Sequence, residues 1–270
     1  MIIAHTPDAD DAFMFYGLIN GKITTRLKLK YIVEDIETLN RKAFHGEIDV
    51  TALSAHAYAF LHHKYRILSV GASVGNGYGP VVVARSGMAL KGRRIAVPGK
   101  YTTANLLLKL AVDCFQPVEL RFDEVIPAVK RGEVDAGLVI HEAQITYPEH
   151  ELAKVLDLWD WWQKKSSGLP LPLGINAIKR SVAEATQREF MVALRDSVRY
   201  ALANVEEATQ YAMQYSRGAD KELVKKFALM YVNNYTYEMP QEVVKALEVL
   251  YRMAWRKGFF ANPPLDILFT

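Results

Sequence analysis

The sequence lacks the features that would place the protein in a membrane or in an oxidising compartment. It contains one cysteine, Cys114, which excludes an internal disulfide and a multi-cysteine metal site. No apolar run approaches the roughly 20 residues that a membrane span requires. The first residues lack the basic start and the continuous apolar core of a secretion signal. We therefore expect a cytoplasmic protein without a membrane partner.

The sequence also has no large excess of charge of one sign. The net charge is +3, from 33 lysines and arginines and 30 aspartates and glutamates that are spread along the chain. No basic run is interleaved with aromatic residues, so we expect no nucleic-acid partner. What the 270 residues do contain is an ordinary globular balance, 50% hydrophobic and 23% charged. This is enough for one large domain or for two lobes with sizeable cores.

The order of expected elements predicts an α/β protein of two lobes. The chain opens with a strand (Ile2–His5), a polar loop and a helix, and the same order restarts at "RRIAVPGKYTTANLLLKLAVD". The segments "HGEIDVTALSA" (45–55) and "RGEVDAGLVIH" (131–141) also match, each between a helix and a strand, which indicates a pseudo-duplication. We assign residues 1–86 and 174–270, with the helical C-terminal part, to lobe 1 and residues 87–173 to lobe 2.

Strands that alternate with helices predict parallel sheets with helices on both faces. In such folds ligands bind beyond the carboxyl ends of strands and at domain interfaces. We therefore expect a cleft between the lobes, lined by four segments: Thr6–Asp11, Leu53–His56, Pro98–Thr103 and His141–Gln144.

Hydroxyl side chains occur where two of the expected helices begin. Thr102 and Thr103 follow the turn at Gly99, and free N–H groups at a helix start can bind a carboxylate or a phosphate. One threonine can equally be a plain helix cap. In lobe 1 the hydroxyl of Ser54 can cap the following helix, contact a ligand, or do both. These residues predict an anionic small-molecule substrate.

His141 follows the apolar run that ends at Ile140 and precedes Glu142. An imidazole that titrates near neutrality suits a general base, and Glu142 could orient it. A histidine at a strand end can also be a structural residue where the chain leaves the core. The residues alone leave both interpretations open.

The first loop crowds Asp8, Asp10 and Asp11 together. One of them can cap the next helix, and an aspartate here can accept hydrogen bonds from substrate hydroxyls. Clustered carboxylates also suit a divalent cation, but the calcium-loop spacing and its glycine are missing. We predict no metal at this loop.

The remaining candidates are weaker. His56 lies just inside a helix start, and we assign no function to His62 and His63 at that helix's far end. The segment "WDWW" (159–162) either stacks on an aromatic ligand or packs its indoles in a helix.

Several segments together resemble the 1,4-dihydroxy-6-naphthoate synthases of the futalosine route to menaquinone. They run from about residue 3 to about residue 178 in the family's order and spacing, with "GEVDAGLVIHEAQITYP" and "GLPLPLG" the most specific; the others are "TPDADDAFMFYGL", "EDIETLNRKAFHGEIDVTALSAHAY", "GYGPVVVAR" and "VPGKYTTANLLL".

The resemblance implies a type II periplasmic-binding-protein-like fold that serves as a cytoplasmic enzyme. It implies cleavage of cyclic dehypoxanthine futalosine to 1,4-dihydroxy-6-naphthoate with release of dihydroxyacetone, without a cofactor. It implies His141 as the proton acceptor. The substrate-binding residues that we carry over are Ala52, Leu53, Ser54, Thr102, Thr103 and Asp11.

The chain departs from the family pattern at the first loop, where Asp8 and Asp10 replace a cysteine and an asparagine, and at Ala52, where a lysine occurs in members of the family. Two alternatives therefore stay open: the related chorismate dehydratase, and a non-catalytic protein that binds small carboxylates. A homodimer is also left open.

Overall fold

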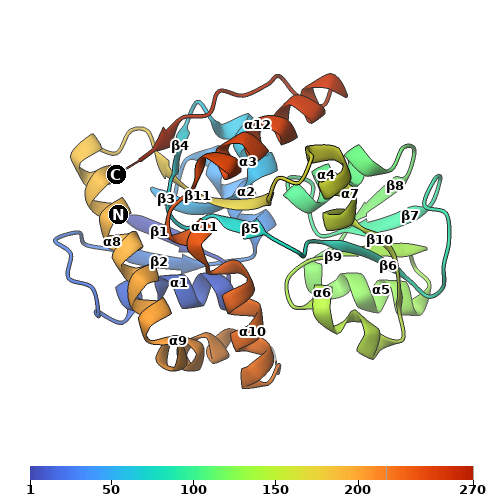
Figure 1. Ribbon diagram of the computed structural model, residues 1–270, viewed down its shortest axis with the longest axis horizontal. Helices are drawn as coiled ribbons and strands as arrows, with labels where there is room; N and C mark the ends of the chain where they lie inside the picture. The colour runs from blue at the N-terminus through green and yellow to red at the C-terminus, as the bar shows by residue number, and fades with distance from the viewer. Residues whose placement is uncertain (217, 270) are drawn as a thin grey trace.

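The computed structural model describes residues 1–216 and 218–269 and contains two β-sheets that lie side by side, each with its own helices (Figure 1). The strands are β1 (Ile2–His5), β2 (Lys30–Val33), β3 (Val50–Ser54), β4 (Tyr65–Leu68), β5 (Ser73–Gly75), β6 (Val81–Ala84), β7 (Arg94–Val97), β8 (Gln116–Glu119), β9 (Ala136–Val139), β10 (Ala153–Asp157), β11 (Leu171–Lys179) and β12 (Ile267–Leu268). The α-helices are α1 (Ala9–Ile19), α2 (Ile36–His45), α3 (Ala55–Leu61), α4 (Thr103–Ala111), α5 (Val125–Arg131), α6 (Ala143–Thr146), α7 (Leu158–Ser166), α8 (Glu184–Ala203), α9 (Val205–Ala212), α10 (Lys221–Tyr231), α11 (Asn234–Tyr237) and α12 (Gln241–Arg256). Short 3₁₀ helices are η1 (Phe122–Glu124), η2 (Tyr147–His150) and η3 (Met213–Tyr215).

The first sheet has seven strands in the order β12-β4-β11-β3-β1-β2, with β5 also paired to β11. Strands β1, β2 and β3 are parallel, whereas β11 runs antiparallel to β3, β4 and β5. The second sheet has five strands in the order β10-β6-β9-β7-β8, and β6 is antiparallel to both of its neighbours. The prediction of parallel sheets is therefore confirmed for β1, β2 and β3 and for β7, β8 and β9, and it is wrong for β6 and β11. The strands that follow each crossing between the sheets, β6 and β11, enter their sheet in the reverse direction.

The sheets divide the chain a little differently from the sequence-based lobes. Strand β6 pairs within the second sheet, although our boundary at residue 86 placed it in lobe 1. Strand β11 pairs in the first sheet from Leu171 onward, before the expected return at residue 174. We therefore propose that the crossings between the lobes lie at residues 76–80 and 167–170.

The pseudo-duplication is visible in matching backbone contacts. The helices α2 and α5 both end at a glycine in the left-handed region, Gly46 (φ 69°) and Gly132 (φ 75°), where a side chain would be strained. The aspartate three residues later makes the same bond in each lobe. Asp49 accepts from the N–H of Ile2 at 2.8 Å, and Asp135 accepts from the N–H of Arg94 at 2.9 Å. The short "GE[IV]D" match thus marks the same local structure in each lobe, a helix-ending glycine followed by an aspartate that binds a strand N–H.

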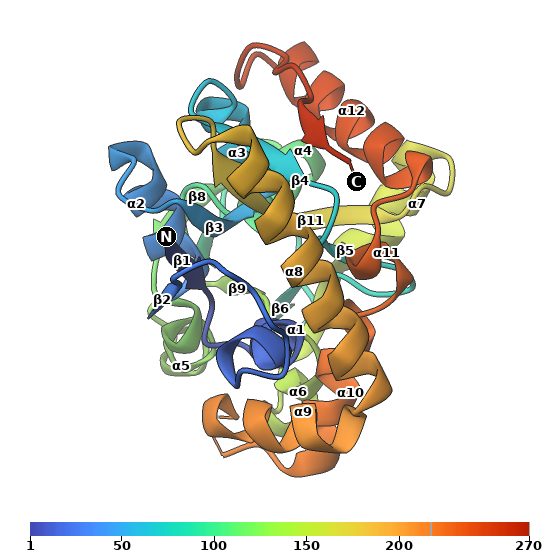
Figure 2. The same cartoon turned by 90° about the vertical axis from the view of Figure 1, so that its left-hand side faces the viewer.

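A shared core holds the two lobes together. One cluster of buried apolar side chains includes residues of both sheets and of the helices between them, such as Leu53 of β3, Leu107 of α4 and Leu250 of α12. A second cluster lies under α1, α8 and α10 of the first lobe. In Figure 2, which looks onto that lobe, α8 lies in front of the first sheet. The C-terminal helices, which the sequence predicted only as helical, therefore cover lobe 1.

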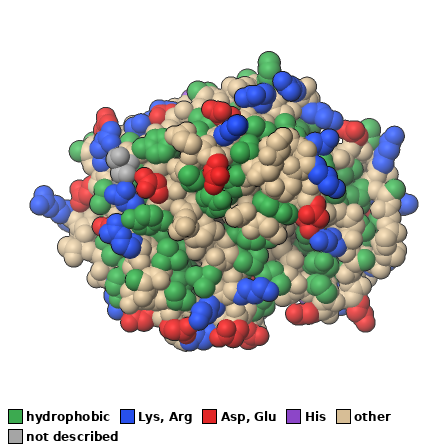
Figure 3. Space-filling view, in the orientation of Figure 1, with side chains coloured by type: hydrophobic (Ala, Val, Ile, Leu, Met, Phe, Trp, Pro, Cys, Tyr) green, Lys and Arg blue, Asp and Glu red, His purple; other side chains and the backbone are tan. Residues whose placement is uncertain are grey.

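The face seen in Figure 3 carries basic and acidic side chains in alternation rather than a wide area of one sign. Within the part of the chain that the structure describes, no helix is long and apolar enough to cross a membrane.

Candidate active site between the lobes

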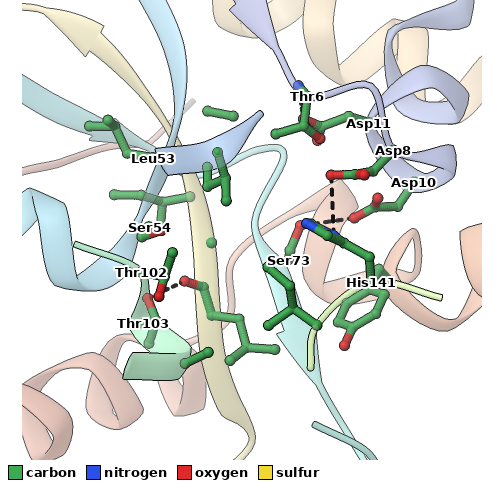
Figure 4. Close-up of a pocket in the computed structure, with 18 of the residues that line it drawn as sticks. Thr6, Asp8, Asp10, Asp11, Leu53, Ser54, Ser73, Thr102, Thr103 and His141 are labelled. Carbon is green, nitrogen blue, oxygen red and sulfur yellow. Dashed lines mark hydrogen bonds and ion pairs between the residues drawn. The ribbon is translucent and has the colours of Figure 1, made fainter. Parts of the chain in front are cut away.

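A cavity of about 690 Å³, counted with the space that opens to solvent, lies where the two lobes face each other. Its lining includes every site residue chosen from the sequence: Asp11, Ala52, Leu53, Ser54, Thr102, Thr103 and His141. Figure 4 shows Ser54 and the two threonines on one side of the cavity and the acidic loop and His141 on the other.

The side chain of His141 reaches the cavity from lobe 2. It is not sealed in the interior, because 15% of the side chain is exposed. The residue directly follows β9 and Ile140 and has a left-handed backbone, with φ at 57°. The ring meets Phe122 edge-on at 5.0 Å between centroids, and Nδ1 lies 3.2 Å from Oδ2 of Asp8. The imidazole is thus held by groups from both lobes, and it lines the same cavity as Thr102.

The first loop places three carboxylates at that side of the cavity. Asp11 closes the loop, since its Oδ2 accepts from the N–H and from the hydroxyl of Thr6 at 2.7 and 2.8 Å. Asp10 accepts from the hydroxyl of Ser73 at 3.4 Å. Burial and the nearby carboxylates of Asp11 and Asp8 raise the pKa of Asp10 well above its ordinary value. Burial also raises the pKa of Asp11, against the bonds from Thr6.

The hydroxyls at the start of α4 are already used within the protein. Thr102 caps the helix: its Oγ1 accepts from the N–H of Asn105 at 3.3 Å and donates to the carbonyl of Gly99 at 3.0 Å. Thr103 donates to the carbonyl of Leu173 at 2.5 Å and accepts from the N–H of His56 at 3.2 Å. The open question of which threonine is the cap is thereby answered. An anion at this point would be met chiefly by the first N–H groups of α4, which have no partner inside the helix.

Ser54 is the last residue of β3 and the N-cap position of α3, but its side chain makes no cap bond. Asn40 of α2 holds it instead: the amide donates to the Ser54 hydroxyl at 3.0 Å and accepts from the Ser54 N–H at 2.9 Å. Because β11 pairs with β3, Asn176 lies opposite Ala52, and both line the cavity. The wall that lobe 1 contributes here is neutral.

Two further contacts join the lobes beside the cavity. Glu37 of α2 accepts from the N–H of Tyr101 at 2.9 Å and approaches Gly99 so closely that a Cβ there would lie 2.6 Å from it. Gly99 is therefore required by close approach, in addition to its φ of 155°. On the opposite side, the hydroxyl of Tyr231 donates to Gln144 at 3.1 Å.

Several lining residues were missed by the sequence reasoning. Leu173 and Gly174 of β11 belong to the "GLPLPLG" segment that carried the resemblance, so their position could have been found. Phe227 and Tyr231 come from α10, where the sequence shows only a helical repeat. Nothing in that repeat distinguishes the face that meets the cavity from the face that meets the core.

His56 and Trp162 of the "WDWW" segment are packed inside the protein rather than facing the cavity. His56 is buried, its Nδ1 lies 3.2 Å from the carbonyl of Thr102, and burial lowers its pKa to about 4. Trp162 is fully buried, and its indole donates to the carbonyls of Leu169 and Pro170 at 2.8 and 3.0 Å. Among residues 1–216 and 218–269, no group of three or more metal-ligating side chains is arranged to hold a metal ion.

Comparison with known proteins identifies the family. A family model described as menaquinone biosynthesis matches residues 1–256. A curated 1,4-dihydroxy-6-naphthoate synthase from Thermus thermophilus is 41% identical over 263 residues, which cover 97% of this chain and 96% of the relative. The chain belongs to the 1,4-dihydroxy-6-naphthoate synthase family. A second synthase, from Streptomyces coelicolor, is 34% identical and covers 95% of this chain and 93% of its own. The predicted family and the prediction of an enzyme of menaquinone biosynthesis are confirmed.

Solved structures confirm the fold of this synthase-family chain. The crystal structure of a protein from Archaeoglobus fulgidus is 62% identical, with a TM-score of 0.94 over 96% of this chain and 98% of that one. A Candida albicans protein that was described as having the generic periplasmic-binding-protein fold has a TM-score of 0.68 at 16% identity, over 100% of this chain and 97% of its own. The two-lobed α/β fold of that class is therefore shown, whereas the roles of the individual site residues stay predictions.

Proposed function

We propose that this protein converts cyclic dehypoxanthine futalosine to 1,4-dihydroxy-6-naphthoate with release of dihydroxyacetone, as a carbon–carbon lyase in which His141 is the general base. The observation that carries the proposal is the convergence of His141, Ser54, Thr102 and Thr103 on one cavity in a chain of the synthase family. We also propose that the reaction takes place in the cytoplasm.

The cavity offers what the substrate's carboxylate needs. The first N–H groups of α4 and the helix dipole favour a negative charge beside Thr103. Ser54 extends this wall from lobe 1, with its hydroxyl held by Asn40. No lysine or arginine lines the cavity within the described residues, so backbone and hydroxyl dipoles would carry the recognition.

His141 supplies the proton acceptor. Removal of one proton provides the electron pair for breaking the carbon–carbon bond to the three-carbon unit, while the new ring becomes aromatic. The reaction needs no net oxidant or reductant, because the substrate is divided between the two products. Closure of two lobes over the guest would exclude water and fix its position.

Incubation of the purified protein with cyclic dehypoxanthine futalosine tests the proposal, with 1,4-dihydroxy-6-naphthoate and dihydroxyacetone followed by liquid chromatography and mass spectrometry. We expect both products in equal amounts. We expect His141→Gln to lower kcat on the order of 10²–10⁴-fold, the range that general acid–base catalysis contributes. His45→Gln, at an exposed histidine at the end of α2, is the matched control and should keep wild-type turnover.

The same assay separates the alternatives. Loss of chorismate in place of the futalosine derivative would indicate the dehydratase. Binding of the cyclic substrate without any product would indicate a binding protein. Near-normal turnover by His141→Gln would leave the lyase activity in place and remove His141 as the base.

A further inference from the structure

The side chain of Asp8 does not cap the helix that it precedes. Asp8 occupies the N-cap position of α1, where an aspartate ordinarily bonds to the first turn and contributes about 1 kcal/mol, yet it makes no side-chain cap bond. Its carboxylate is 3% exposed, and Oδ2 lies 3.2 Å from Nδ1 of His141. Burying a carboxylate is costly unless a partner compensates it. The recorded ion-pair partner of Asp8 is thus His141 across the cavity, and its side chain does not cap α1.

The chemistry of this contact decides which ring nitrogen can act as a base. An ionised carboxylate only accepts hydrogen bonds, so Asp8 favours a proton on the imidazole nitrogen that faces it, Nδ1. In the neutral ring the lone pair is then on Nε2. When Nε2 takes up a proton, the resulting imidazolium lies beside the negative charge of Asp8, which stabilises it.

Two other features restrict the same ring. The left-handed backbone of His141 costs roughly 1–2 kcal/mol for a residue other than glycine, and such strain is concentrated at functional sites. Phe122 of lobe 2 contacts the ring edge-on, with 82° between the ring planes. Backbone and Phe122 set where the ring lies, and Asp8 then faces one of its two nitrogens.

We propose that Asp8 is the positioning residue of His141: it keeps the proton on Nδ1, leaves Nε2 to take the substrate's proton, and stabilises the imidazolium that forms. This inference rests on the proposed role of His141 as the general base. Asp8 belongs to lobe 1 and His141 to lobe 2, so the base is fully arranged only while the lobes are as close as they are here.

Other charged groups surround the pair and have to be separated from Asp8 in a test. Asp10 and Asp11 line the same cavity from α1, and Tyr231 does so from α10. Glu142 is adjacent in the chain and acts electrostatically on Asp10. Beside Phe122, Asp123 accepts from Arg121 at 2.9 and 3.1 Å. Of these groups, Asp10 is the best comparison, because it is a buried carboxylate two residues from Asp8 whose recorded hydroxyl partner is Ser73.

The test compares Asp8→Asn with Asp10→Asn in the full-length protein, by ¹⁵N NMR of labelled histidine and by turnover of the cyclic substrate. The His141 signals are assigned from their loss in His141→Gln. In wild-type protein and in Asp10→Asn we expect the neutral ring to carry its proton on Nδ1. In Asp8→Asn we expect the proton to move to Nε2 and kcat to drop on the order of 10²-fold with little change in KM.

The outcomes distinguish this inference from the proposed function, because the NMR measurement needs no substrate. An unchanged tautomer and an unchanged kcat in Asp8→Asn would overturn the inference while leaving the lyase activity intact. Equal effects of Asp8→Asn and Asp10→Asn would overturn it too, since loss of any buried carboxyl group from this side of the cavity would then suffice. Absence of turnover in wild-type protein would instead refute the proposed function. If Asp8→Asn does not fold, as judged by circular dichroism, Asp8→Ser enters the same comparison.

Discussion

The hydroxyl of Thr103 offers a direct test of how the cavity wall is built. It joins the start of α4 to two other segments, since it donates to the carbonyl of Leu173 and accepts from the N–H of His56. Thr103→Val keeps the shape of the side chain and removes both bonds. Each buried group that loses its partner costs about 1–3 kcal/mol. Water from the cavity can replace part of this, so we expect a total loss of about 2–3 kcal/mol.

For a chain of this size the loss corresponds to a fall of roughly 4–5 °C in the thermal unfolding midpoint, measured by differential scanning calorimetry without ligand. Thr103→Ser retains the hydroxyl and should lose less than half as much. Thr186→Val, at a half-exposed position of α8, controls for the change of residue type. A midpoint within 1–2 °C of wild type for Thr103→Val, or an equal fall for Thr103→Ser, would refute the reasoning. The hydroxyl would then not stabilise the contacts of α4 with Leu173 and His56.

Two further predictions concern stability. Burial lowers the pKa of His56 from 6.5 to about 4, so the unfolded chain takes up a proton first and stability falls as the pH drops from about 6.5 to about 4. At about 1.4 kcal/mol per pH unit, wild-type protein should lose about 2 kcal/mol at this site between pH 6.5 and 5, and urea unfolding of His56→Phe should lack this component. Trp162→Phe removes an indole donor from two carbonyls in the core, and we expect a loss of about 2–4 kcal/mol in the same assay; a loss below 1 kcal/mol would contradict the assigned contacts.

Much of the site could be predicted because its residues follow strands. The strand ends at His5, Ser54, Val97 and Val139 lead into the four segments named from the sequence, and all four contribute to the cavity. The local pattern predicts where a strand ends, and the edge of a sheet gathers such ends in space. The two lobes and the repeated glycine–acid motif could be predicted for the same reason.

The direction of strands and the contacts across the cavity could not be predicted in this way. The antiparallel entry of β6 and β11 depends on how the chain crosses between lobes, which no short pattern encodes. The sequence suggested Glu142 as the partner of His141, because the two are adjacent. The contact at Nδ1 is with Asp8, which is 133 positions away in the chain and close only because the lobes face each other.

The distribution of charge in the cavity determines how an anionic guest can lie. Two unit charges 4 Å apart repel by about 4 kcal/mol near a protein surface, so a carboxylate beside ionised Asp8 would be strongly disfavoured. Near the start of α4 the same group gains up to about 1–2 kcal/mol from the helix dipole. The start of α4, beside Ser54 and Thr103, therefore attracts a carboxylate. The negative charge of Asp8 on the opposite wall repels it, so both walls favour the same orientation. For the proposed substrate, this predicts that the uncharged, hydroxyl-bearing part lies beside His141, where carboxylates can accept hydrogen bonds and the imidazole can take a proton.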